Sequence, residues 1–165
     1  MGARVNARGE PAIPGGAAGS LEALQAFFRS APGARRATRP LARETEVGLD
    51  LGGEPARFTM ASGTAEVLAG PARDPDFTLV IPPAAVPRLT AGDHGVGALG
   101  VAFFQLVRSK EPELHVGVRL HASTSRLVKH GYLRVLALGG LEVAFYLLRA
   151  GVSRPLESLE RLRRR

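Results

Sequence analysis

The chain has 165 residues, of which 45% are hydrophobic and 22% charged, which is typical of a single globular domain. It contains no cysteine, which excludes disulfides, thiol catalysis and Cys-ligated metal sites. The formal net charge of +7 comes from the ends, since residues 1–43 carry +5, residues 44–148 carry −2 and residues 149–165 carry +4.

The N-terminal quarter predicts one short helix between two irregular segments. Residues 1–20 are rich in Gly, Ala and Pro, so they are expected to be disordered. Ser20 is expected to cap an amphipathic helix over residues 21–29. Residues 30–43 hold two prolines and several arginines, and they predict a basic linker.

The next part of the chain alternates apolar and polar residues, which is typical of β-strands with one wet face. The pattern predicts three antiparallel strands, with turns at Gly52-Gly53 and Ser62-Gly63. A fourth strand is bounded by prolines, which cannot donate a ladder hydrogen bond. The four strands are expected at residues 47–51, around Phe58 and Met60, at residues 64–68 and at residues 77–81.

Beyond residue 82 the pattern is mainly helical. A helical turn at residues 82–89 precedes an apolar helix that begins at Val96 and that we expect to be buried or to line an apolar cavity. A fifth, one-sided strand follows at residues 116–120. Ser123 or Thr124 is expected to cap a helix that continues to Gly139-Gly140, with further helices at residues 141–148 and after Ser153.

A membrane span at residues 132–148 is rejected. Arg134 and Glu142 lie inside it, and each costs about 2.5–3.5 kcal/mol near the centre of a spanning helix.

The residues that could carry chemistry do not form a recognisable site. Residues 95–100 spell G-x-G-x-x-G, but dinucleotide binding needs that motif directly after a strand, and the strand before it ends some 13 residues earlier. His115 and His121 stand about 20 Å apart along one strand, too far to share a metal. We expect no catalytic residue, metal or cofactor. The side chains of all four histidines, His94, His115, His121 and His130, are expected to be solvated. Asp74 and Asp76 are expected to be turn formers.

The order of elements resembles the sterol carrier protein type 2 (SCP2) domain. The resemblance rests on Ala56-Arg57-Phe58-Thr59-Met60, the Ser62-Gly63 turn and residues 76–81. It continues through Leu89-Thr90-Ala91-Gly92 and Ala102-Phe103-Phe104-Gln105. The family commonly closes its last strand with Gly-Asp, whereas this chain has His121-Ala122. The resemblance assigns residues 21–122 to an SCP2-like domain and residues 123–165 to a helical C-terminal extension packed on it.

The resemblance implies an α+β fold, in which a five-stranded mixed, mainly antiparallel sheet is covered by helices, with extra C-terminal helices. It also implies a tunnel between sheet and helices for a sterol, a fatty acyl chain or another lipid, and hence non-catalytic lipid binding or transport. The wall residues expected from the apolar pattern are Phe77, Leu79, Leu99, Phe103, Leu106, Val107, Phe145 and Leu148. The alternative is that these side chains only fill a solid core.

Two other classes of function stay open. An accessory module, as in the quinone-lipid biosynthesis that SCP2-like domains serve, would use the apolar helices to join a partner protein or a second copy. A nucleic-acid binder would use the basic ends, although the near-neutral middle argues against it. The basic ends also fit transient contact with an anionic membrane surface. An excess of Arg over Lys is typical of a GC-rich bacterial gene, and no apolar run follows the first charges, so we expect a bacterial, cytoplasmic protein.

Overall fold

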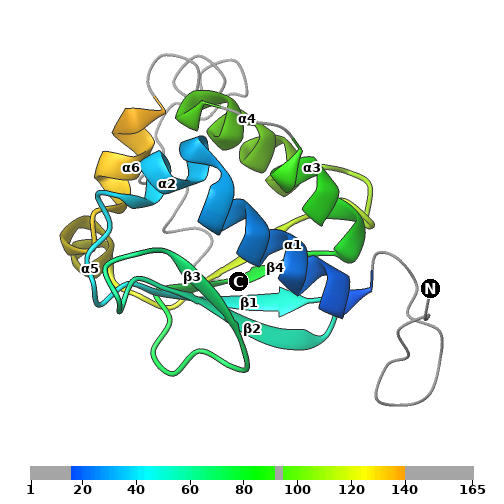
Figure 1. Ribbon diagram of the computed structural model, residues 1–165, viewed down its shortest axis with the longest axis horizontal. Helices are drawn as coiled ribbons and strands as arrows, with labels where there is room; N and C mark the ends of the chain where they lie inside the picture. Colours follow the sequence, from blue (N-terminus) through cyan, green and yellow to red (C-terminus); the bar gives the residue numbers. More distant parts are fainter. Residues whose placement is uncertain (1–15, 92–94, 140–165) are drawn as a thin grey trace.

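The computed structural model describes residues 16–91 and 95–139. Helices and strands follow one another as Figure 1 shows. In chain order they are α1 (Ala17–Ser30), α2 (Pro32–Thr38), β1 (Glu46–Leu51), β2 (Glu54–Thr59), β3 (Glu66–Ala69), β4 (Phe77–Val80), the 3-10 turn η1 (Pro83–Ala85), α3 (Val86–Thr90), α4 (Val96–Val107), β5 (Gly117–Leu120), α5 (Thr124–Lys129) and α6 (Tyr132–Leu138).

The five strands form one mixed sheet in the order β3-β2-β1-β4-β5. Strands β1, β2 and β3 are successive antiparallel neighbours, and β4 pairs with β5 antiparallel. The parallel pair is β1 with β4, where Leu49 lies opposite Leu79. The predicted fold class is therefore confirmed.

The hairpin between β1 and β2 shows why its two glycines are needed. Gly52 and Gly53 both have positive φ, +68° and +98°. Two-residue hairpin loops favour this geometry because it matches the twist of the strands, and a side chain would strain it. Asp50 supports the turn, because its carboxylate accepts a 2.7 Å hydrogen bond from the Gly53 amide.

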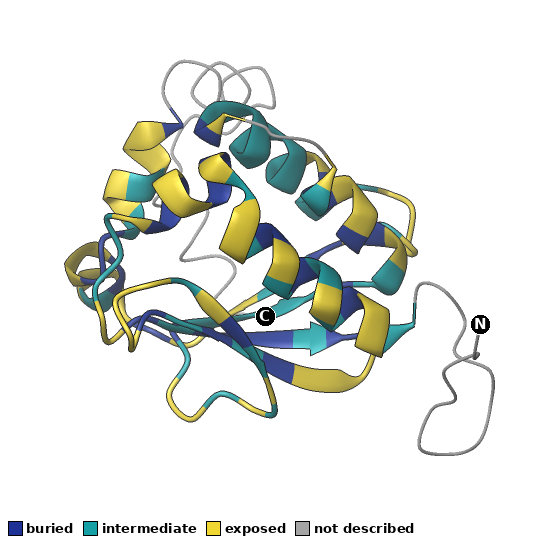
Figure 2. Cartoon of the chain, viewed as in Figure 1, coloured by how far each residue is buried: buried dark blue, intermediate teal, exposed yellow. Residues whose placement is uncertain are grey.

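Helices α1, α3 and α4 lie over one side of the sheet in Figure 1. Many of the buried apolar residues of the core lie on β1 and β2 and on the helices above them, and Figure 2 draws these segments dark. Val47, Leu49 and Leu51 alternate along β1 onto this covered face, and Leu24 of α1 belongs to the same cluster. The period-two pattern of the sequence therefore placed the core face correctly.

The N-terminal helices differ from the expectation. Helix α1 begins at Ala17, and Ser20 lies inside it, where its hydroxyl donates to the Gly16 carbonyl at 3.2 Å instead of capping the helix. The expected basic linker contains helix α2, with Pro32 in its first turn. Proline suits that position because its missing N–H would be unpaired there in any case. Helix α1 therefore begins four residues before the helix expected at residue 21, and the expected linker contains a helix, whereas residues 1–15 lie outside the described part.

The C-terminal helices also differ from the expectation. In place of one helix running to Gly139, α5 and α6 are separated at Gly131, whose φ of +91° does not continue a helix. Ser123 caps α5 as predicted, because its hydroxyl accepts a 3.3 Å hydrogen bond from the Arg126 amide. The helices expected at residues 141–148 and after Ser153 lie outside the described residues. Among the residues that are described, no helix is long and apolar enough to cross a membrane.

Candidate functional site

The apolar cover of the sheet is uneven, and the less covered half holds the predicted ligand site. Strands β1 and β2 bury most of their helix-facing residues, but all four residues of β4 are only half-buried. This is unexpected for β4, because it is paired on both sides and lies inside the sheet. Phe77 and Leu79 lie on the same face of the sheet as Leu49, which is the face toward the helices. Their partial exposure means that the helices cover this part of the face incompletely.

Helix α4 is also incompletely buried. Its sequence is VGALGVAFFQLV, yet only Val96 and Leu106 are buried, and Leu99 and Phe103 are half-buried. Its backbone packs on α2, α3 and α6. The end of the helix is fixed to the start of β5, because the Leu106 carbonyl accepts a 3.1 Å hydrogen bond from the Val116 amide. An apolar helix with this little burial leaves much apolar surface accessible.

Six of the eight predicted wall residues are described, and five of them come together. Leu106 belongs to the core cluster, and four others pack against it while staying half-buried. Those four are Phe77, Leu79, Phe103 and Val107. Leu99 lies one helical turn before Phe103 and is half-buried. Phe145 and Leu148 lie outside the described residues.

Two surface hollows are present elsewhere. One of about 920 Å³ lies between α1, α2 and the β2–β3 hairpin, and one of about 520 Å³ lies among α1, α2 and α3. Neither is lined by any of the six predicted wall residues that the structure describes. The tunnel therefore stays a prediction.

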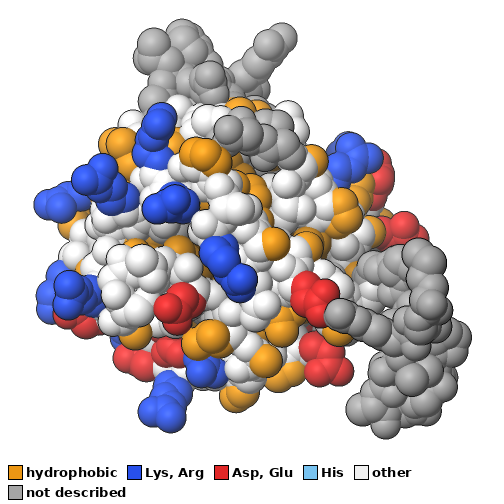
Figure 3. All heavy atoms as spheres, viewed as in Figure 1, with side chains coloured by type: hydrophobic (Ala, Val, Ile, Leu, Met, Phe, Trp, Pro, Cys, Tyr) orange, Lys and Arg blue, Asp and Glu red, His pale blue; other side chains and the backbone are white. Residues whose placement is uncertain are grey.

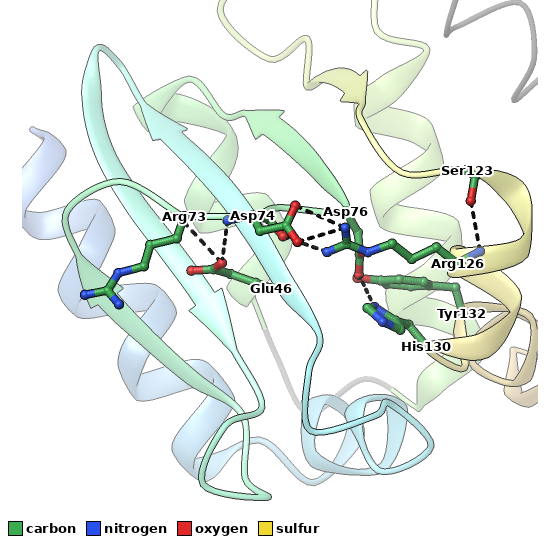
Figure 4. Close-up of polar contacts among 8 residues, drawn as sticks. All are labelled: Glu46, Arg73, Asp74, Asp76, Ser123, Arg126, His130 and Tyr132. Atoms are coloured by element: carbon green, nitrogen blue, oxygen red, sulfur yellow. Dashed lines mark hydrogen bonds and ion pairs between the residues drawn. The ribbon is translucent and has the colours of Figure 1, made fainter.

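The most polar part of the interior is a cluster around Asp76, drawn in Figure 4. The Asp76 side chain is wholly buried at the start of β4. Its Oδ2 accepts hydrogen bonds from His130 Nδ1 at 2.7 Å and from the Tyr132 hydroxyl at 2.9 Å. Since a carboxylate can only accept, the His130 proton must lie on Nδ1. The Arg126 Nε lies 2.8 Å from Oδ1 but is not aligned for a hydrogen bond, so this contact is an ion pair.

Asp74 holds the outer end of the same cluster. The Arg126 guanidinium donates to the Asp74 carboxylate at 3.0 Å and to its carbonyl at 2.8 Å. The hydrogen bond from Arg126 lowers the pKa of the Asp74 carboxyl. Glu46 of β1 holds the loop from the other side, since its carboxylate accepts from the Arg73 and Asp74 amides. Asp74 is thus an exposed loop residue, as expected.

Two expectations about this cluster were wrong. Asp76 is not a surface turn former, and His130 is not solvated, because its side chain is buried against Asp76. Burial, and then the Asp76 charge, raise the pKa of Tyr132, so its hydroxyl stays a donor. No spacing could have revealed the cluster, since Asp76 lies 54 residues before His130 and 56 before Tyr132.

The Asp76 cluster is built to hold structure. Both oxygens of the carboxylate are occupied by side chains of α5, α6 and the turn between them. The Asp76 carbonyl also accepts from the His121 and Ala122 amides, at 3.0 and 2.8 Å. A carboxylate engaged on both oxygens has little capacity left for a substrate or metal. We assign this cluster a positioning role: it fixes α5 and α6 against the sheet.

The remaining candidate residues are the other three histidines. His115 and His121 are exposed as expected, and His121 contacts the Thr78 hydroxyl at 2.9 Å on the sheet face away from the helices. His94 lies outside the described residues. Across the described ranges, no group of three or more His, Cys, Asp or Glu side chains is arranged to hold a metal ion.

Comparison with known proteins gives a likeness to a solved structure. No family model and no curated protein matches the sequence. A solved structure titled "UbiJ-SCP2 Ubiquinone synthesis protein" is similar over 76% of this chain and 94% of its own, with 20% identity and a TM-score of 0.42. Its title names the family that the sequence resembles.

Proposed function

We propose that this protein binds an apolar ligand, without catalysis, between α4 and the half of the sheet formed by β4 and β5. The observation that carries the proposal is the incomplete burial of an apolar helix and of an inner strand whose side chains pack against the same core cluster. Leu99 and Phe103 on α4, and Phe77 and Leu79 on β4, are all half-buried. In a solid core such side chains would be close-packed and inaccessible.

The ligand class follows from the chemistry of these side chains. They are aliphatic or aromatic and offer no charge or hydrogen bond, so they favour a sterol, a fatty acyl chain or an isoprenoid quinone precursor over a polar metabolite. Each buried CH₂ of such a ligand contributes about 0.8 kcal/mol. Carriage of that lipid in the bacterial cytoplasm, with contact to an anionic membrane through the basic ends, is the fuller form of the proposal.

The proposal is tested by identifying bound lipid. Native mass spectrometry of the purified protein, followed by solvent extraction, is expected to show co-purified lipid. Leu99→Asp is expected to remove that lipid and to weaken binding of a fluorescent neutral sterol about tenfold, because a carboxylate would enter the apolar wall. Leu136→Asp, on the exposed side of α6, serves as the matched control and is expected to bind normally. Lipid-free protein that ignores the fluorescent probe would refute ligand binding.

A second function is favoured by a different surface. Val128, Leu133, Leu136 and Leu138 of α5 and α6 are each 38–48% exposed. Large apolar side chains gathered on neighbouring helices are typical of a protein–protein interface, so an accessory module that joins a partner or a second copy is the alternative. It predicts that the mass in solution depends on concentration and that Leu136→Asp, not Leu99→Asp, abolishes the association.

A further inference from the structure

The 920 Å³ hollow has a structure suited to a different ligand. Its floor is apolar, since Met60 and Val67 are buried and Phe28 is half-buried. Gln25 closes one side by donating from its side-chain amide to the Val67 carbonyl at 3.0 Å, which ties α1 to the edge strand β3. The hollow lies on the β3 side of the sheet, whereas the proposed lipid site lies at β4 and β5.

The lining of this hollow carries an excess of positive charge. Arg29 at the end of α1 and Arg35, Arg36 and Arg39 on or beside α2 line it, against a single acid, Glu66. Figure 3 shows Lys and Arg side chains gathered on the face where α1 and α2 lie. The sequence of α2 produces this arrangement, because Ala34 and Ala37 turn inward and are buried while the arginines are exposed.

Among the described residues, these arginines have no partner that would explain their gathering. Over residues 16–91 and 95–139, none of the four guanidinium groups forms an ion pair or a hydrogen bond. Glu66 is held instead by the Ser62 hydroxyl, at 2.8 Å from its Oε1. Four arginines and a single acid give the lining of the hollow a net positive charge, which favours an anion. The planar guanidinium group matches the two-oxygen edge of a carboxylate or phosphate.

We propose that this arginine-rimmed hollow binds a single amphiphile, with its carboxylate or phosphate head group among the arginines and its alkyl part on the apolar floor. The site is separate from the lipid site proposed above and does not depend on it. A bilayer surface is flat and does not enter a concavity. A single-stranded nucleic acid would bind more tightly to exposed aromatic rings that stack on its bases, whereas Phe28 is packed on Phe58 with ring centroids 5.1 Å apart.

The test uses dodecyl phosphate, below its micellar concentration, titrated into the full chain by calorimetry. We expect one bound molecule, and binding weakened about fivefold by the double substitution Arg35→Gln and Arg36→Gln. A double variant with the same charge change, Arg119→Gln and Lys129→Gln, is the matched control. Both of its positions are exposed and lie outside the hollow, so it is expected to bind like the unaltered protein.

Three further measurements separate this site from other sources of binding. Leu99→Asp is expected to leave dodecyl phosphate binding intact, so that loss of the proposed lipid site is distinguishable. Neutral dodecanol and inorganic phosphate are each expected to bind more weakly than the combined molecule. The proposal is overturned if phosphate alone binds equally well, if dodecanol binds equally well, or if only anionic vesicles or a short oligonucleotide bind. Equal binding by both double variants would also overturn it.

Discussion

Asp76 is the residue that connects the end of the described chain to the sheet. Its carboxylate contacts Arg126 of α5, His130 in the turn after α5, and Tyr132 of α6. The same residue also joins the sheet by its backbone, since its amide donates to the Glu46 carbonyl at 2.8 Å. A charge this deeply buried is tolerated because Oδ1 is ion-paired with Arg126 and Oδ2 accepts two hydrogen bonds.

We therefore expect Asp76→Asn to lower the free energy of unfolding by about 3 kcal/mol, measured by urea denaturation. An amide keeps the size of the side chain but loses the charge that pairs with Arg126, and its NH₂ group would meet donors. Asp74→Asn provides the comparison, because that carboxylate lies at the exposed end of the cluster and its loss should have little effect. Equal losses from both substitutions would contradict the positioning role assigned to Asp76.

At the scale of elements, Gly131 decides how the C-terminal helices pack. It ends α5 and begins α6 with a φ of +91°, and a Cβ placed there would overlap the Pro40 carbonyl oxygen. The loop before β1 is held at the same point, because the Ala42 amide donates to the His130 carbonyl at 3.0 Å. The close approach of two backbones therefore requires glycine.

Gly131→Ala is accordingly expected to destabilise the protein by about 3 kcal/mol, through strain at positive φ added to overlap with Pro40. Gly19→Ala is the matched opposite case. Gly19 lies within α1, and an added Cβ would meet nothing within 4 Å, so alanine should stabilise the helix by about 0.5–1 kcal/mol. Thermal unfolding compares the two variants directly. A shift of the melting temperature in the same direction for both would contradict the surroundings described for the two glycines.

For the whole molecule, the main feature is the difference between the two halves of the sheet. The half at β1 and β2 is covered by a continuous core, whereas β4, β5 and α4 keep partly accessible apolar side chains. Regions with fewer buried contacts open more readily, so stability should not be uniform over the fold. The same half is where a ligand would complete the packing.

Hydrogen exchange followed by mass spectrometry is expected to show this difference. Without added ligand, amides of α4 and β5 should exchange faster than those of β1 and β2. An added neutral sterol should slow exchange in α4 and β5 by about tenfold and leave β3 unchanged, because bound ligand adds its binding free energy to local stability only where it contacts the protein. Protection spread evenly over the sheet would argue against a site in this half.

The sequence by itself determined the elements of the sheet and their core face. Period-two alternation located the strands, paired glycines located the hairpin, and the apolar run from Val96 located α4, because these features depend on residues close together in the chain. Helix α2 was missed, since its short arginine-rich sequence shows no apolar periodicity and its burial depends on what packs against Ala34 and Ala37.

Only the tertiary structure decided what the polar residues do. Asp76 and His130 are 54 residues apart, and the sequence gives each the appearance of a surface residue. The hollow beside α2 likewise combines arginines from one segment with an apolar floor from another. Local patterns record which face of an element is apolar, whereas the pairing of a buried charge and the depth of a binding surface depend on contacts between distant segments.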